Sequence, residues 1–259
     1  MQEFDEGDPL LSTKRLVDRD IKSANVAVRQ GFVRKVYAIL TTQLVVTVLV
    51  ASQIVQLATQ REEKAGKQYI SLWLQDHQWL LWLSVGMTTA TVCAMACCRD
   101  LCRTFPFNYL FLFTFTLFEA VMIGFASAMF TPQSVLLAAA VAVLLFWALT
   151  GYAFLARTDF TGAGPYLFAA LIGLLLFGSA LILLPMLGIP ITVTMAIYDY
   201  IGVLIFSFFI IFDTQLMLGQ WGGHQVSISI DEYVFAALNL YLDFINIFLH
   251  LLSLFGERK

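Results

Sequence analysis

Polar and ionisable side chains follow one face of the last hydrophobic segment of this sequence. From residue 232 to residue 253 they are separated by 7, 4, 3, 4 and 3 residues. At about 100° of rotation per residue, these positions fall within an arc of roughly 80° on a helix. Because a charge inside hydrocarbon costs on the order of 3 kcal/mol, the pattern favours a helix that lines a buried polar route; hydrogen bonding between helices is the simpler alternative. The positions are Glu232, Asn239, Asp243, Asn246, His250 and Ser253.

Asp213 and Asp243 are the strongest candidates for a functional site. Their two segments are joined by a short loop with three glycines, so the helices are expected to run antiparallel and side by side. Folding them about the centre of the loop puts Asp213 opposite Leu238, about 7 Å of helical rise from Asp243. Two carboxyl groups in one low-dielectric site cannot both ionise cheaply, so we expect them to share a proton and to respond to pH.

Other charged residues could complete this site. A cation could replace the shared proton, and Ca²⁺ prefers oxygen ligands, so the aspartate pair is also a candidate Ca²⁺ site. Arg99 or Arg103 could pair with the ionised form, although anchoring at the membrane edge is the simpler role. Glu119 ranks second as a residue lining the route, and Asp199 is interpreted as a carboxylate at the membrane interface.

Membrane-spanning helices are the elements that must position these residues. Hydrophobic residues make up 59% of the 259 residues and charged residues 13%, whereas soluble domains carry about 25% charged residues. Seven stretches reach the roughly 20 apolar residues that cross a bilayer. We expect an all-α integral membrane protein with a flexible tail over residues 1–30 and a seven-segment domain over residues 31–259. The predicted segments are Val36–Leu57, Trp79–Cys98, Phe107–Phe130, Ser134–Ala156, Pro165–Leu184, Val193–Leu218 and Tyr233–Phe255.

The basic residues orient the chain. Ten lysines and arginines lie on the N-terminal side of the predicted membrane and three on the opposite side. By the positive-inside rule the N-terminus is cytosolic. Arg258 and Lys259 fit a re-entrant last segment better than a full span, and both remain open. A formal net charge of −3 gives no reason to expect nucleic-acid binding.

Two short features lie outside the route. All four cysteines fall between Cys93 and Cys102, which argues against a disulfide framework and favours reduced thiols over palmitoylation or a metal site. Glu6, Leu10 and Leu11 have the spacing of an acidic dileucine sorting signal for endosomal, vacuolar or lysosomal membranes. A pattern this short arises more often by chance.

The run from Asp231 to Leu252 closely resembles the C-terminal signature of the Bax-inhibitor family, Lifeguard branch. The resemblance extends from Phe32 to the C-terminus. Shorter matching motifs lie before segments one and three, within segment three, after segment four and within segment six. They are Phe32-Val-Arg-Lys-Val-Tyr37, Pro106-Phe-Asn108, Phe118-Glu119-Ala120, Asp159-Phe-Thr161 and Phe212-Asp213-Thr214.

The resemblance implies a seven-helix bundle with the C-terminal helix at its centre. It implies that Asp213 and Asp243 form a pH-sensing pair that holds a Ca²⁺ leak pathway closed, helped by an arginine for which Arg103 and then Arg99 are the nearest candidates. It also implies a cytoprotective, anti-apoptotic protein of the endoplasmic reticulum or Golgi, with endosome, vacuole and lysosome as other locations. Its partners would be Ca²⁺ as permeant ion, protons, membrane lipid and cell-death regulators, without a cofactor.

Three functions other than a channel also use polar residues within membrane helices. An intramembrane aspartyl protease also uses two membrane aspartates, but neither Asp213 nor Asp243 lies in a Gly-x-Gly-Asp setting, so an enzyme is disfavoured. An interaction protein whose polar face only joins helices stays open. A proton-coupled Ca²⁺ exchanger stays open as well, because a carboxylate pair can exchange protons for a cation.

Overall fold

The computed structural model describes residues 26–65, 69–97, 104–188, 190, 192–219, 228–229 and 232–258. These residues form eight α-helices, and an isolated β-bridge joins Phe130 to Arg258. Six of the helices are long and apolar enough to cross a membrane. The predicted all-α membrane fold is confirmed.

Seven of the eight helices correspond to the seven predicted segments. Two of them begin with proline in the first turn, where its missing N–H costs no hydrogen bond. A short 3₁₀ turn, Leu184–Leu187, follows α8. It ends at Gly188, whose φ is 73°, because glycine adopts this left-handed conformation without strain. The seven are α2 (Val26–Ala65), α4 (Gln78–Cys97), α6 (Phe107–Ala128), α7 (Pro132–Leu155), α8 (Gly164–Leu183), α9 (Thr192–Leu218) and α10 (Tyr233–Phe255).

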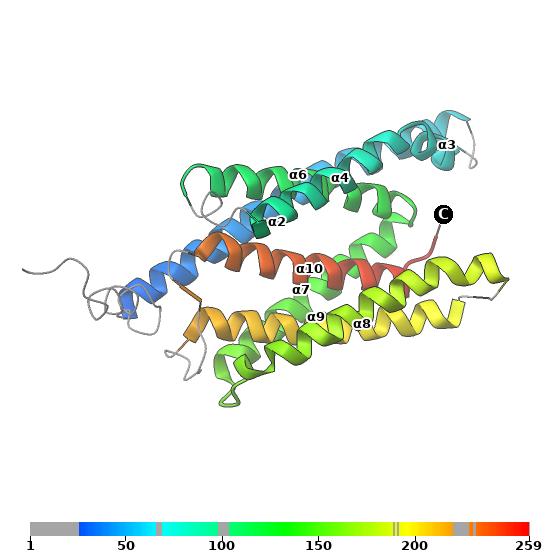
Figure 1. Ribbon diagram of the computed structural model, residues 1–259. Helices are drawn as coiled ribbons and strands as arrows, with labels where there is room; N and C mark the ends of the chain where they lie inside the picture. The colour runs from blue at the N-terminus through cyan, green and yellow to red at the C-terminus, as the bar shows by residue number, and fades with distance from the viewer. Residues whose placement is uncertain are drawn as a thin grey trace, which may run out of the picture.

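Two helices differ from the prediction. Helix α2 has 40 residues and begins at Val26, so the last five residues of the predicted tail are helical. At about 1.5 Å per residue it is roughly twice as long as a bilayer is thick, and it runs along the whole bundle in Figure 1. Helix α3 (Tyr69–Asp76) was not predicted, because eight residues are too few for a span. Its Trp73 contacts Phe125 of α6, with ring centroids 5.8 Å apart.

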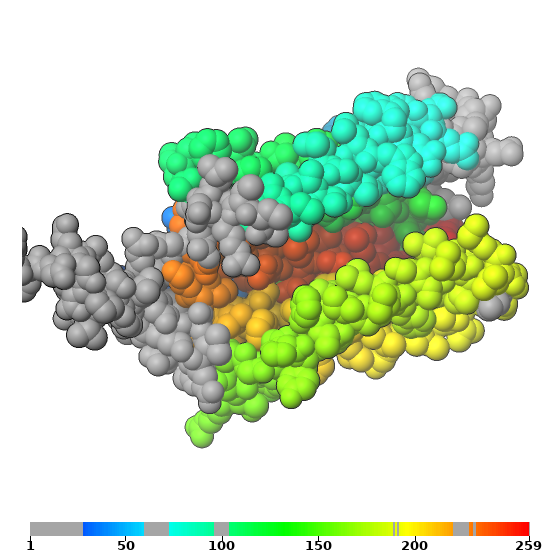
Figure 2. Space-filling model, viewed as in Figure 1, coloured from blue at the N-terminus to red at the C-terminus, as the bar shows by residue number. Residues whose placement is uncertain are grey.

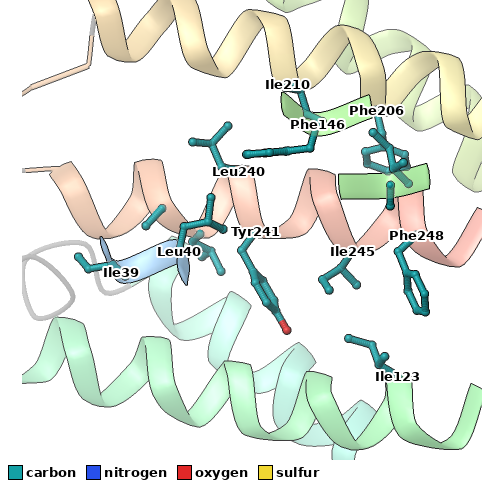
Figure 3. Close-up of a cluster of buried hydrophobic side chains, with 14 of the residues drawn as sticks. Ile39, Leu40, Ile123, Phe146, Phe206, Ile210, Leu240, Tyr241, Ile245 and Phe248 are labelled. Atoms are coloured by element: carbon teal, nitrogen blue, oxygen red, sulfur yellow. The ribbon is translucent and has the colours of Figure 1, made fainter. Parts of the chain in front are cut away.

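Helix α10 lies at the centre of the bundle, as the resemblance implied. It contacts α2, α6, α7 and α9, and Figure 1 shows it between one group made of α2, α4 and α6 and another that contains α8 and α9. Within its most apolar window 67% of the residues are buried, against 11% for α8. Figure 3 shows the core around it, where Leu240, Tyr241 and Phe248 meet side chains from α2, α6, α7 and α9.

The last helix crosses the bundle without a break. Its 23 residues end beside the turn between α6 and α7, where the Thr131 N–H donates to the Glu257 carbonyl at 2.9 Å. The Arg258 guanidinium lies 5.8 Å from the centre of the Phe130 ring. The bundle therefore has an N-terminal end, where α2 and α10 begin, and a C-terminal end, where α10 ends and α9 begins (Figure 1). An unbroken helix of 23 residues is long enough for a full span.

Candidate functional site

Asp213 and Asp243 meet between α9 and α10. Asp213 is 6% exposed and Asp243 5% exposed, and their carboxyl groups contact each other directly. Among the described residues, Oδ2 of Asp243 has no hydrogen-bond partner. Buried polar atoms without partners are uncommon in folded proteins. The antiparallel hairpin thus brings together the two carboxyl groups singled out from the sequence.

Three buried hydroxyl groups form a polar layer beside the pair. Tyr37 of α2 directs its hydroxyl toward those of Thr150 on α7 and Thr214 on α9. Within the described part of the chain, none of the three hydroxyl oxygens has a partner at hydrogen-bonding distance and angle. Since Thr214 follows Asp213 directly in α9, the carboxyl pair and these hydroxyls belong to one region of the bundle. The two carboxyl groups are oxygen ligands of the kind that Ca²⁺ binds.

Gln215 fixes the loop after α7 onto α9, directly beyond Asp213 and Thr214. Its Oε1 accepts a hydrogen bond from the Phe160 N–H at 2.8 Å, and its Nε2 donates to the Thr158 carbonyl at 3.0 Å. Asp159 closes the loop by accepting from the N–H and the hydroxyl of Thr161. The Asp159-Phe-Thr161 motif therefore has a structural role in the loop that Gln215 holds against α9. Gln215 was not predicted from the sequence, because a neutral glutamine stands out less in an apolar span than an ionisable residue does.

Glu119 lies on the other side of α10. It is 9% exposed on α6 and lies near the hydroxyl of Tyr241, which bonds Thr47 of α2 at 2.8 Å. Tyr241 and Asp243 are two residues apart in a helix, so their side chains point about 200° apart. Figure 3 shows the Tyr241 hydroxyl directed toward α6. The structure therefore does not bring Glu119 to the acid pair, and a role in lining the route stays a prediction.

Asp199 is not an interfacial carboxylate, as the sequence had suggested, but a buried one. It is 3% exposed, and its Oδ1 lies 2.9 Å from Nδ1 of His250 on α10. Its Oδ2 accepts a hydrogen bond from the hydroxyl of Ser253. His250 also stacks on Phe206 of α9, with ring centroids 5.9 Å apart. We call Asp199, His250 and Ser253 the histidine cluster; it lies toward the C-terminal end of the bundle.

The remaining polar residues of α10 divide between buried and open positions. Asn239 is exposed and Asn246 half-buried, with Nδ2 of Asn246 donating to the Leu242 carbonyl of its own helix. The two positions are seven residues apart, so they lie on nearly the same face of α10. Figure 2 shows the surface of α10 between α4 and α8, where the surrounding helices leave it uncovered. Glu232 lies half-buried just before the first turn of α10.

Comparisons with known proteins identify the family. Residues 29–259 match the family described as "Inhibitor of apoptosis-promoting Bax1". The chain belongs to the Bax inhibitor family. It is 33% identical to "Bax inhibitor 1" of Schizosaccharomyces pombe over 234 residues, which cover 89% of this chain and 77% of that protein.

Lifeguard proteins are similar relatives within the same family. The identity to "Protein LIFEGUARD 4" of Arabidopsis thaliana is 33% over 234 residues, or 89% of this chain and 86% of that protein. The identity to "Protein lifeguard 3" of Homo sapiens is 30% over 233 residues, or 90% of this chain and 70% of that protein. The Bax inhibitor resemblance inferred from the motifs is confirmed.

Several candidate residues named from the sequence lie outside the described part of the chain. These are Arg99 and Arg103, the candidate partners of the acid pair, and the sorting-signal residues Glu6, Leu10 and Leu11. Within the described ranges no three histidine, cysteine or acidic side chains gather closely enough to hold a metal ion. A Ca²⁺ ion at the acid pair of this Bax inhibitor family member would therefore rely on hydroxyl, carbonyl or water oxygens for its other ligands.

Proposed function

We propose that this chain is a pH-regulated Ca²⁺ leak channel of an intracellular membrane, with an anti-apoptotic role. The observation that carries the proposal is the direct contact of Asp213 and Asp243 between two membrane helices. Ionisable residues at such depth are expensive and mark ion or proton pathways. The description of the family, "Inhibitor of apoptosis-promoting Bax1", supports the part of the proposal that concerns cell death.

The acid pair would act as a latch because its proton content sets the force between α9 and α10. With one proton shared, the two carboxyl groups attract each other and hold the helices together. With none, two like charges about 4 Å apart repel by about 4 kcal/mol at an effective dielectric constant of 20. A cation that enters the layer of Tyr37, Thr150 and Thr214 oxygens would relieve this repulsion. Ca²⁺ would thus pass as cargo through the same region that senses protons.

Ca²⁺ flux into proteoliposomes, measured between about pH 6 and pH 8, tests the latch. We expect flux that varies with pH in the native chain and varies clearly less with pH in Asp213→Asn and Asp243→Asn. Ser207→Ala is the matched control on α9, because within the described residues its hydroxyl bonds only the Val203 carbonyl of its own helix, at 2.7 Å. It should keep the native pH profile.

The sign of the pH dependence identifies what holds the pair together. If flux rises toward alkaline pH, the shared proton is the latch. If flux rises toward acid pH, the ionised pair is held by a cationic group, for which Arg99 and Arg103 are the candidates. Charge-removing variants Arg99→Gln and Arg103→Gln then separate the two arginines.

Two alternative functions predict different results in the same vesicles. A proton-coupled exchanger requires a proton gradient, so its flux would disappear when internal and external pH are equal and a protonophore is present. An interaction protein gives no protein-dependent flux at any pH, which would overturn the channel.

The intracellular location and a cytosolic N-terminus are part of the same proposal. They are supported by the ten basic residues on the N-terminal side of the predicted spans. An epitope tag before Met1 should react with antibody in cells whose plasma membrane alone is permeabilised, and the tagged protein should co-localise with endoplasmic reticulum or Golgi markers. Reaction only after internal membranes are opened would reverse the orientation.

A further inference from the structure

The histidine cluster has the geometry of a second clamp between α9 and α10. Both carboxylate oxygens of Asp199 are bonded from α10, one by the imidazole of His250 and one by the hydroxyl of Ser253. Residues 250 and 253 are one helical turn apart, so they reach the same carboxylate from one face. Every polar contact in this cluster therefore joins one helix to the other.

The imidazole ring is enclosed as well as bonded. A methyl group placed on Gly202 would lie 2.4 Å from Nε2 of His250, so this position requires glycine for the ring to rest against α9. Tyr198 meets the ring edge-on at 5.2 Å between centroids, and Phe206 stacks on it. With α9 touching the ring on three sides, the helices cannot slide past each other unless the ring moves first.

The cluster and the acid pair are separate sites on the same two helices. Seven residues, or about 10 Å of rise, separate Asp243 from His250 on α10, and fourteen residues, or about 21 Å, separate Asp213 from Asp199 on α9. A route that follows this helix pair meets one site in its N-terminal half and the other near its C-terminal end.

We propose that Asp199, His250 and Ser253 form a second, proton-sensitive closure of the conduction route, in series with Asp213 and Asp243. The inference rests on the proposed function, because it assigns the cluster a role in the same pathway. Histidine changes charge between about pH 5 and pH 8. With a charged imidazole the cluster is neutral overall, whereas with a neutral imidazole the buried Asp199 carboxylate lacks a compensating charge. The closure is therefore tightest on the acid side and loosens as the pH rises.

Few other titratable groups act on His250. Helix α9 contributes Asp199 and Tyr198, and α6 contributes Glu119, which lies near Tyr241 on another face of α10. Between residues 38 and 60 helix α2 has no titratable side chain, and α7 has none before Tyr152. Within the described residues, Glu257 and Arg258 lie beyond α10, against the turn between α6 and α7.

Spin labels at Ile197→Cys and Phe255→Cys report the closure without relying on flux, in the full chain with its native cysteines replaced by serine. Both positions are exposed, one at the start of α9 and one at the end of α10. We expect the distance distribution to broaden when the pH is raised from about 5.5 to about 8. His250→Asn keeps a hydrogen-bond donor for Asp199 but cannot titrate, so its distribution should not respond to pH. A native distribution that ignores pH overturns the proton-sensitive closure.

Flux through the same variants tests the role of the cluster in conduction. His250→Phe should raise Ca²⁺ flux about tenfold at the acid end of the range, since losing charge-assisted hydrogen bonds shifts an equilibrium by at least that factor. His250→Asn should lose the part of the pH dependence of flux that comes from the histidine cluster. Ser207→Ala should keep the full pH dependence. If both His250 variants show the same flux and pH dependence as the native chain, the second closure is overturned and the acid latch is left intact. Absence of native flux overturns the channel itself, while the label distances still report on the clamp.

Discussion

The two ends of the contact between α9 and α10 are built from opposite chemistry. At the C-terminal end, Asp199 is bonded through both oxygens to complementary donors on α10. In the N-terminal half, Asp213 and Asp243 are like groups in contact, and one oxygen of Asp243 has no partner among the described residues. Buried polar groups stabilise a fold only when they are satisfied. The histidine cluster should thus hold the helices together, whereas the acid pair should add little stability and remain free to respond to protons.

Asp199→Ala should have the largest effect on stability of the variants that test this contrast. It leaves the buried donors of His250 and Ser253 without a partner, so the free energy of unfolding should fall by about 3 to 5 kcal/mol. Reversible unfolding in mixed detergent–lipid micelles measures the change. Asp199→Asn keeps one acceptor oxygen, so its free energy of unfolding should fall clearly less than that of Asp199→Ala. Equal and small losses in both variants would show that the cluster does not stabilise the helix pair.

Gly202→Ala tests the packing of the same cluster without changing a polar atom. The added methyl group would lie 2.4 Å from His250 Nε2, so the ring must move and the free energy of unfolding should fall by about 1 to 3 kcal/mol. Gly173→Ala on α8 is the matched control, because nothing lies within 4 Å of the added methyl group. There the better helix propensity of alanine should give no loss. Similar results for both glycines would argue against a tightly enclosed imidazole.

Hydropathy predicted the bounds of a helix well where the whole helix is an apolar span, and poorly where a helix extends beyond such a span. The bounds of α10 match the prediction at both ends because polar residues flank a single apolar run. Helix α2 exceeds its predicted span because Arg29, Arg34 and Lys35 favour a helix but are too polar for a hydropathy window. Hydropathy also missed α3, whose eight residues pack through Trp73 rather than cross the membrane.

Part of the candidate site was predictable from the sequence, because the short loop makes the last two helices antiparallel neighbours. Folding the last two helices about their loop placed Asp213 near Asp243, and the same folding places Asp199 opposite Leu252, between His250 and Ser253. The signal for the histidine cluster was therefore present in the sequence. The side chain of Asp199 was misjudged because depth along a helix does not reveal whether a neighbour covers it. The tie from Gln215 to the loop after α7 joins segments 55 and 57 residues away, which no local pattern reveals.

Gln215→Leu ranks below the cluster variants because it removes hydrogen bonds without stranding a charge. The Phe160 N–H and the Thr158 carbonyl would lose their side-chain partner, which predicts a loss of about 1 to 3 kcal/mol in the free energy of unfolding. Gln215→Glu keeps the acceptor for Phe160 but loses the donor to Thr158, so it separates the two bonds. If Gln215→Leu were neutral, the loop would not depend on α9 for its position.

Asp243→Asn should have the smallest effect on stability, even though its effect on pH-dependent flux should be the largest. The amide has nearly the shape of the carboxyl group and can donate to Asp213, so it replaces the shared proton with a permanent one. The free energy of unfolding should therefore change by about 1 kcal/mol or less. The double variant Asp213→Asn with Asp243→Asn should behave alike, because no charge is stranded. A loss as large as that of Asp199→Ala would mean that Asp243 is held in ionised form by a cation, and the two ends of the helix pair would then share one chemistry.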